Sequence, residues 1–160
     1  MPETTTKIEI RDMRTAEDAE AFRVLNEEWI TNLFTLEEKD RGVLGDPEGK
    51  IVRPGGRVFV VYAEQEAVGC VALIFMGEDQ YELAKMAVSP KLRGLGIGRK
   101  LIEYAIGQAR GMGAKKLVLG TNSKLGNAVH LYEAVGFEHR PPKGPAAAYA
   151  RADVYMEMEL

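Results

Sequence analysis

Apolar and polar residues alternate at the start of the chain and then recur with helical spacing. Within Lys7–Met13, Ile8 and Ile10 alternate with polar neighbours, which predicts a half-buried strand. Thr15 follows, and a Thr at this position caps helices because its hydroxyl accepts a hydrogen bond from an unpaired main-chain N–H. The predicted helix runs to about Asn32. Its expected buried stripe consists of Ala21, Phe22, Leu25 and Trp29.

A short helix and an irregular connection are predicted next. Thr35 and Glu38 have the spacing of a capping box, which predicts a second helix starting there. From Arg41 to Gly56, several glycines and two prolines interrupt any regular period, and this segment is expected to be irregular.

Segments rich in Val, Ile and Phe then predict an antiparallel meander of three strands, the first two joined by a tight turn at Gln65-Glu66. An amphipathic helix leads from the third strand to a fourth, and such a crossover makes its two strands parallel. The predicted elements are strands at Arg57–Glu64, Ala67–Met76 and Tyr81–Val88, a helix to about Met112 that buries Leu101, Ala105, Ala109 and Met112, a strand at Lys116–Thr121, a helix over Lys124–Val135 that stops at Gly136, and strands at Phe137–Arg140 and Val154–Leu160.

These elements predict a single domain over residues 1–160 of the α/β (α+β) class, with a mixed, mostly antiparallel sheet flanked by helices. A length of 160 residues, 46% of them hydrophobic, suits one core. The 21 basic and 24 acidic residues give a net charge of −3, which argues against a nucleic-acid partner. No apolar run reaches the length of a membrane span, so no membrane partner is expected. The expected location is the cytoplasm. Cys70, the one cysteine, lies in an apolar strand and is expected to be a buried core residue without a disulfide or metal.

A basic, glycine-dense loop between the third meander strand and the next helix is the most distinctive stretch. It reads Arg93-Gly94-Leu95-Gly96-Ile97-Gly98 and is followed by Arg99. Glycines let main-chain N–H groups approach an anion, and a helix start adds unpaired donors and the positive end of the helix dipole. The pattern favours a phosphate-binding loop over the alternative, an ordinary turn with capping glycines.

Two common phosphate loops do not fit this stretch. The dinucleotide fingerprint would need Gly or Ala where Arg99 stands, and the Walker loop would need Lys-Ser or Lys-Thr directly after Gly98. The pattern Arg-x-x-Gly-x-Gly, at Arg93, Gly96 and Gly98, does fit, and it follows an apolar strand. In this it resembles the acyl-CoA loop of the GNAT (N-acetyltransferase) superfamily. The run Ala128–Phe137 also resembles the family's second signature.

The resemblance implies a fold, a co-substrate and a set of contacts. A central strand-helix-strand unit would bind acetyl-CoA without a metal, where the strand before the loop splays from the next parallel strand. The strand's exposed main chain would hold the pantetheine arm, and the N–H groups of Leu95–Arg99 would form a nest for the pyrophosphate. The implied cofactor-binding residues are Met86, Ala87, Val88, Arg93, Gly94, Leu95, Gly96, Ile97, Gly98, Arg99, Asn122 and Asn127.

The implied reaction is acetyl transfer from a thioester to a primary amine by direct attack, which needs a general base and a general acid. Glu82 is the candidate base, directly or through water. Strand alternation would place Glu82 and Met86 on one face of the strand, about 13 Å apart. The alternative is a solvated or salt-bridged strand glutamate.

Tyr132 is the candidate acid, because a helix tyrosine of the family's second signature approaches the CoA sulfur; the alternative is a core tyrosine. The family's usual CoA-contacting asparagine is replaced by Leu125 in this chain. Asn122 and Asn127 are nearby substitutes, although Asn122 could equally cap a helix. His130 and His139 are expected to be structural or exposed.

The acceptor, a small molecule or a peptide, would be selected by the first two helices, the connection after them and the loop Pro141–Asp153. Carboxylates in the early region could draw a cationic amine, and the alternative for each of them is a solvated helix face. They are Glu27, Glu28, Glu37, Glu38, Asp40, Asp46 and Glu48. A homodimer is compatible with the architecture. The alternative function is a non-catalytic acyl-CoA sensor or interaction module on the same fold, and a nucleotide-binding protein is disfavoured by the failed loop patterns.

Overall fold

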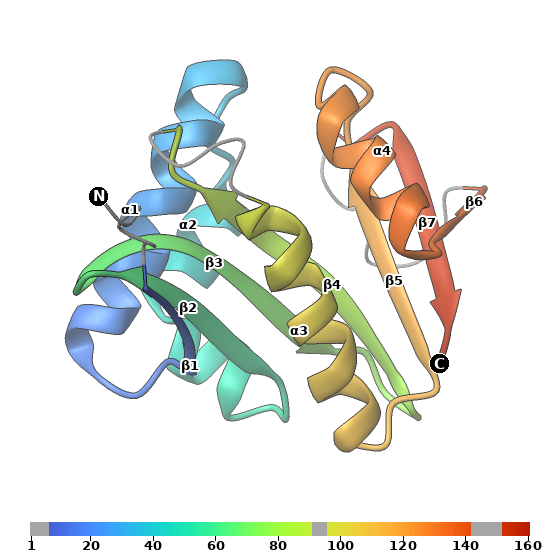
Figure 1. Cartoon of the computed structure of the whole chain (residues 1–160), viewed down its shortest axis with the longest axis horizontal. Coiled ribbons are helices and arrows are strands. Elements are labelled where there is room, and N and C mark those ends of the chain that lie inside the picture. Colours follow the sequence, from blue (N-terminus) through green and yellow to red (C-terminus); the bar gives the residue numbers. More distant parts are fainter. Residues whose placement is uncertain (1–6, 91–95, 142–151) are drawn as a thin grey trace, which may run out of the picture.

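The computed structural model describes residues 7–90, 96–141 and 152–160, whose seven strands form one sheet in the order β1-β2-β3-β4-β5-β7-β6 (Figure 1). All neighbouring strands are antiparallel except β4 and β5. The mixed, mostly antiparallel sheet is the predicted one. The elements are β1 (Ile8–Asp12), α1 (Ala16–Leu33), α2 (Glu38–Gly45), the single π-helical turn η1 (Glu48–Val52), β2 (Arg57–Ala63), β3 (Glu66–Phe75), β4 (Gln80–Val88), α3 (Ile97–Gly111), β5 (Lys116–Thr121), α4 (Gly126–Val135), β6 (Glu138–Arg140) and β7 (Val154–Glu159).

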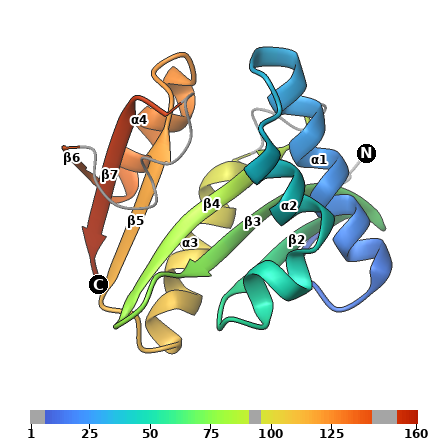
Figure 2. The same cartoon turned by 180° about the vertical axis from the view of Figure 1, so that it is seen from behind.

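Helices cover both faces of the sheet. Helices α3 and α4 lie on the face seen in Figure 1, and α1, α2 and η1 lie on the opposite face, seen in Figure 2. Two hydrophobic clusters follow this division: one joins the sheet to α3 and α4, and the other joins it to α1, α2 and η1. Of the stripe predicted for α3, Leu101, Ala105 and Ala109 are fully buried, and Met112 is partly buried. No helix among the described residues is both long and apolar enough to span a membrane.

The turn of the first hairpin lies one residue earlier than predicted. Glu64 and Gln65 both have positive φ, at 49° and 72°, and Ala63 pairs with Glu66. Two left-handed residues at the tip of a two-residue hairpin match the right-handed twist of the flanking strands, which favours this turn although neither residue is glycine.

The buried stripe of α1 differs from the predicted one. Thr15 caps the helix as expected, and its hydroxyl oxygen accepts from the Asp18 N–H at 3.1 Å. The fully buried residues are Asp18, Phe22, Asn26 and Ile30, whereas the predicted Leu25 and Trp29 are partly buried. Two of the four are polar and satisfied: the Asp18 carboxylate accepts the Tyr62 hydroxyl, and the Asn26 amide contacts Cys70 Sγ at 3.3 Å. Cys70 is buried, as predicted.

Three further boundaries correct the predictions. The N-cap of α2 is Glu37 rather than Thr35, because the Glu37 N–H donates to the Asp40 carboxylate at 2.9 Å. The segment expected to be irregular from Arg41 to Gly56 contains the end of α2 and all of η1. Helix α4 begins at Gly126 instead of Lys124, because the preceding residues form a turn closed by the Leu125 N–H on the Asn122 carbonyl at 2.9 Å. It ends at Gly136 with φ of 114°, the expected left-handed cap.

The unit β4–α3–β5 is the predicted crossover, and its two strands pair only at one end. The parallel ladder runs from Gln80–Lys116 to Glu82–Val118. Beyond that point β4 and β5 diverge (Figures 1 and 2). The side of β4 that faces β5 therefore has main-chain groups, from Leu83 onward, outside this ladder.

Candidate active site

A cleft of about 690 Å³ lies where β4 and β5 diverge. It is lined by β4, the first turn of α3, the β5–α4 turn, α4 and the C-terminal end of α1. The structure brings most of the predicted site residues together in this cleft. Those that line it are Glu82, Met86, Ala87, Val88, Gly96, Ile97, Gly98, Arg99, Asn122, Asn127 and Tyr132. The predicted Arg93, Gly94 and Leu95 lie outside the described residues.

A β-bulge in β4 overturns the predicted common face of Glu82 and Met86. Ala72 pairs with Ala84 and Cys70 pairs with Ala87, so three steps on β4 face two on β3. The extra residue shifts the side-chain alternation by one. Lys85, within the bulge, has a φ of +55°.

Because of this shift, even-numbered residues before the bulge and even-numbered residues after it point to different faces of the sheet. Glu82 lies opposite Ile74, which belongs to the cluster under α1 and α2, so its side chain is on that face. Met86 packs instead with the cluster under α3 and α4. The prediction of about 13 Å along one face is wrong, and the two side chains meet the cleft from opposite sides of the sheet.

Glu82 is a buried carboxyl group at the α1–α2 side of the cleft, with 8% of its surface exposed. Burial raises its pKa from the ordinary value of 4.5, and the positive charges of Lys39 and Lys85 partly offset this rise. A carboxyl group with a raised pKa is suited to accept a proton near neutral pH.

A buried ion pair beside Glu82 was not predicted from the sequence. Lys85 Nζ lies 2.5 Å from Asp40 Oδ1, and the side chains are only 4% and 0% exposed. The pair joins the bulge of β4 to helix α2. In the sequence, Asp40 belongs to a run of charged residues and Lys85 looks like one polar position of a strand, so no local pattern indicates that they meet.

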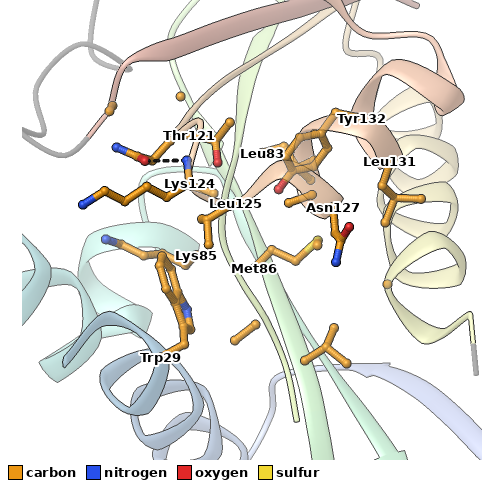
Figure 3. A pocket seen from close by; sticks show the side chains of 18 of the residues that line it. Trp29, Leu83, Lys85, Met86, Thr121, Lys124, Leu125, Asn127, Leu131 and Tyr132 are labelled. Atoms are coloured by element: carbon orange, nitrogen blue, oxygen red, sulfur yellow. Dashed lines mark hydrogen bonds between the residues drawn. The ribbon is translucent and has the colours of Figure 1, made fainter. Parts of the chain in front are cut away.

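Tyr132 projects from α4 into the cleft, and its hydroxyl points towards the interior of the cleft (Figure 3). The residue is 8% exposed, and its ring contacts Phe137 edge to face at 5.9 Å between ring centres. Burial raises the pKa of Tyr132 to about 12, so the phenol keeps its proton at neutral pH.

The first turn of α3 forms the opposite end of the cleft. Gly96, with φ of +73°, is its N-cap, and the Gly96 carbonyl accepts from the Lys100 N–H at 3.1 Å. The N–H groups of the first turn have no acceptor within the helix and carry the positive end of its dipole. A Cβ atom at Gly98 would lie 3.3 Å from Leu131 Cδ2 of α4, a tight contact, so the absence of a side chain at Gly98 leaves room between the two helices where both line the cleft. These features fit the pyrophosphate of a coenzyme A group.

The β5–α4 turn and α4 supply the polar residues on the remaining side. The Asn122 side-chain oxygen accepts from the Lys124 N–H at 2.8 Å, which closes a turn rather than capping α4, whose N-cap is Leu125. Asn127 is exposed and lines the cleft near Met86 and Leu131 (Figure 3). The two histidines are exposed and both contact Glu133, in agreement with a structural role.

The acidic wall expected around the acceptor does not line the cleft. Of the described residues that do, Glu82 is the one carboxylate, and none of the seven early carboxylates is among them. The lining contains Trp29, Leu33 and Phe34 from the end of α1 and its cap instead, with Lys85 and Lys124. Among the described residues, no group of three or more His, Cys, Asp or Glu side chains is placed to hold a metal ion.

Residues 10–137 match the profile of the Acetyltransferase (GNAT) family. This chain belongs to the GNAT family. An uncharacterized N-acetyltransferase of Escherichia coli, YjgM, is 42% identical over 111 residues, which are 68% of this chain and 66% of that protein's length. Two solved acetyltransferase structures illustrate the similarity in fold. An acetyltransferase from Streptococcus agalactiae superposes with a TM-score of 0.84 at 21% identity, covering 96% of this chain and 98% of that one. An N-acetyltransferase from Thermoplasma acidophilum, solved with coenzyme A, gives a TM-score of 0.72 at 20% identity over 96% and 99% of the two chains.

The predicted family and fold class are thereby confirmed. The family match and the relative's name place the chain among acyltransferases.

Proposed function

We propose that this protein is an N-acetyltransferase that moves the acetyl group of acetyl-CoA to a primary amine by direct attack, with Glu82 as general base and Tyr132 as general acid. One observation carries the proposal. A single cleft has anion-binding helix donors at one end, a buried protonated phenol in the middle and a buried carboxyl group at the other face of the sheet.

The cofactor would be held mainly by main-chain groups. Because the ladder with β5 stops at Glu82, the β4 main chain at Met86–Val88 can pair with the amides of a pantetheine arm. The N–H groups at Ile97–Arg99 would bind the pyrophosphate, together with the predicted contacts of Arg93, Gly94 and Leu95. Asn122 and Asn127 would flank the arm from the β5–α4 side. When bound, acetyl-CoA supplies an acetyl group already activated as a thioester.

Two proton movements are assigned to residues of the chain. An amine is largely protonated at neutral pH, and it must lose a proton before it can attack a carbonyl carbon. Glu82, directly or through water, accepts that proton. Tyr132 carries a proton on its hydroxyl oxygen that it can donate to the departing sulfur, and its pKa of about 12 ensures that the proton is present.

The direct test is free CoA release from acetyl-CoA across a panel of primary amines, combined with calorimetric titration of CoA. Amine-dependent release above the hydrolysis rate would support the enzyme. Tight CoA binding without release for any amine would favour the sensor or interaction module. Absence of any CoA binding would contradict both.

Tyr132→Phe is expected to lower kcat by about 10²-fold, because proton transfer by one positioned group contributes about 10²-fold or more. KM for acetyl-CoA should change little, since the ring and its contact with Phe137 remain. The measurement is steady-state CoA release, with near-ultraviolet circular dichroism as a check on folding. Tyr155→Phe, a tyrosine on β7 whose hydroxyl donates to the Ala152 carbonyl, is the matched control. Full activity of the Tyr132 variant would return this residue to a packing role.

Gly98→Val is expected to weaken CoA binding at least about tenfold. The added side chain would push against Leu131 across the passage between α3 and α4, and a β-branched residue would fill the space beside the helix donors. Gly107→Val is the matched control, because Gly107 is an exposed glycine of the same helix whose added Cβ meets nothing within 4 Å. Calorimetric titration of CoA into both variants makes the comparison. Equal CoA affinities would contradict the assignment of this end of the cleft.

A further inference from the structure

The two ends of the cleft differ in chemistry, and the end away from the cofactor indicates a class of acceptor. Resting on the proposed function, we infer that the acceptor is an amino acid with an apolar side chain. Its carboxylate would meet Lys124, its side chain would pack on Trp29 and Phe34, and its amine would face Glu82.

The first observation is the cationic character of the acceptor end. Figure 3 shows the amino groups of Lys124 and Lys85 on the same side of the cleft, above Trp29 and away from Asn127 and Tyr132. Lys85 contacts Asp40, so its charge is largely balanced. Lys124 is exposed, and its Nζ lies 5.8 Å from the centre of the Phe34 ring. Both residues line the cleft. An anionic group that enters this end of the cleft would be attracted by the Lys124 ammonium group.

The turn that carries Lys124 is fixed by several hydrogen bonds. The Lys124 N–H donates to the Asn122 side chain at 2.8 Å. Ser123 donates to the Asp153 carboxylate through both its main-chain N–H and its hydroxyl, each at 2.8 Å. These bonds lower the pKa of Asp153 and engage its two oxygens, and Lys124 lies within the electrostatic reach of that carboxylate. The main chain of Lys124 is thus held in place while its long side chain extends over the cleft.

The second observation is an apolar wall facing this lysine. Trp29 and Phe34 pack edge to face with ring centres 6.2 Å apart. The Trp29 Nε1–H donates to the Asn26 side-chain oxygen at 3.2 Å, which fixes the orientation of the indole. Leu33 beside them is 52% exposed, a high value for a leucine that lines a cleft. An apolar side chain of the acceptor would cover these surfaces and remove them from water.

The third observation concerns the acceptor's amine. Glu82 is the one carboxylate that lines the described part of the cleft, so the site offers one anion for one ammonium group. A second positive charge on the acceptor, as in a diamine, would lie near Lys124 and be repelled. At this end of the cleft, Glu82 and the exposed Lys124 stand beside an apolar wall while Lys85 is paired with Asp40, and this arrangement is complementary to an amino acid.

The experiment compares amino acids with their decarboxylated counterparts. CoA release is measured with L-phenylalanine against phenethylamine, L-leucine against isopentylamine, and with a diamine, cadaverine. We expect kcat/KM to be at least about tenfold higher for each amino acid than for its amine, which corresponds to the loss of one charge-assisted contact. Cadaverine should be the poorest acceptor.

Variants of Lys124 connect that preference to the proposed contact. Lys124→Met has an unbranched apolar side chain and should reduce the ratio of kcat/KM for the amino acid to kcat/KM for its amine about tenfold. Lys124→Arg keeps the positive charge and should retain most of the parent ratio. Lys115→Met is the matched control, because Lys115 is 80% exposed and contacts Asp79 outside the cleft. It should leave the ratio unchanged.

The outcomes separate the inference from the function on which it rests. Release of CoA with amino acids and amines at equal efficiency, or a ratio unaffected by Lys124→Met, would overturn the inference and leave the acetyltransferase intact. No release from any acceptor, with CoA binding measured by calorimetry, would contradict the acetyltransferase function and the inference together.

Discussion

Asp40→Asn is expected to lower the free energy of unfolding by about 3–5 kcal/mol, the largest stability effect that we predict for a single polar substitution. The change keeps the shape of the side chain and removes the charge that Lys85 contacts at 2.5 Å. Both side chains are buried, so the ammonium group would remain in a poorly solvated place without its carboxylate. Removing one partner of a buried pair usually costs this much, because the remaining charge is uncompensated. Urea unfolding followed by fluorescence of Trp29 would measure it.

Two comparisons make this prediction specific to the buried pair. Asp79→Asn removes the charge from an exposed pair with Lys115 and should leave the unfolding transition nearly unchanged. The double variant Asp40→Leu with Lys85→Met replaces both charges by apolar groups and should recover much of the lost stability. If Asp40→Asn unfolds at the same urea concentration as the parent, the contact between α2 and the bulge contributes nothing to the free energy of unfolding.

The sequence was informative where a local pattern determines the structure. The alternation in the meander, the strand-helix-strand order that follows it and the cap at Gly136 each depend on residues close in the chain, and they predicted the sheet, the crossover and the end of α4. The family signatures located Glu82 and Tyr132, which the structure places in one cleft. These features are readable because their physical cause lies within a few residues.

Features that depend on distant partners were missed or misassigned. The bulge in β4 arises from its pairing with β3. The local sequence around Lys85 does not predict that this residue has a φ of +55°. Strict alternation therefore put Glu82 and Met86 on one face, which the bulge overturns. In α1, the polar Asp18 and Asn26 lie on the buried side because Tyr62 on β2 and Cys70 on β3 form hydrogen bonds with them.

The acidic wall expected from the early carboxylates is absent from the described lining of the cleft for the same reason. Counting carboxylates in the early region took no account of where their side chains point, and Asp40 is buried against Lys85 rather than facing the acceptor. The cleft instead receives Lys124 from a turn more than eighty residues away in the chain. A count of carboxylates along the sequence therefore did not predict which charged side chains line the cleft.

Glu82→Gln is expected to lower kcat by about 10²- to 10⁴-fold while acetyl-CoA still binds, because the amide is nearly isosteric but cannot take a proton from the amine. The parent enzyme should lose activity as the pH falls through the raised pKa of Glu82, since protonation removes the base. In the variant this acidic limb should disappear, and the remaining slope should follow the ionisation of the amine itself. The measurement is kcat against pH between about 5 and 9, with CoA affinity from calorimetry. Glu64→Gln, at the exposed β2–β3 turn outside the cleft, is the matched control and should keep the parent profile.

The stability of the same variant separates a catalytic role from a structural one. Burial raises the pKa of Glu82 above its ordinary 4.5, so the folded protein holds this proton more tightly than the unfolded chain does. The contribution of this group to stability is therefore complete below pH 4.5 and is lost as the pH rises through the raised pKa. Gln carries no such charge, and Glu82→Gln should unfold no more readily than the parent at pH 7. A variant that is slow and also unstable would indicate that Glu82 supports the fold. A variant that is stable, binds CoA and keeps the parent kcat at every pH would remove Glu82 from the reaction.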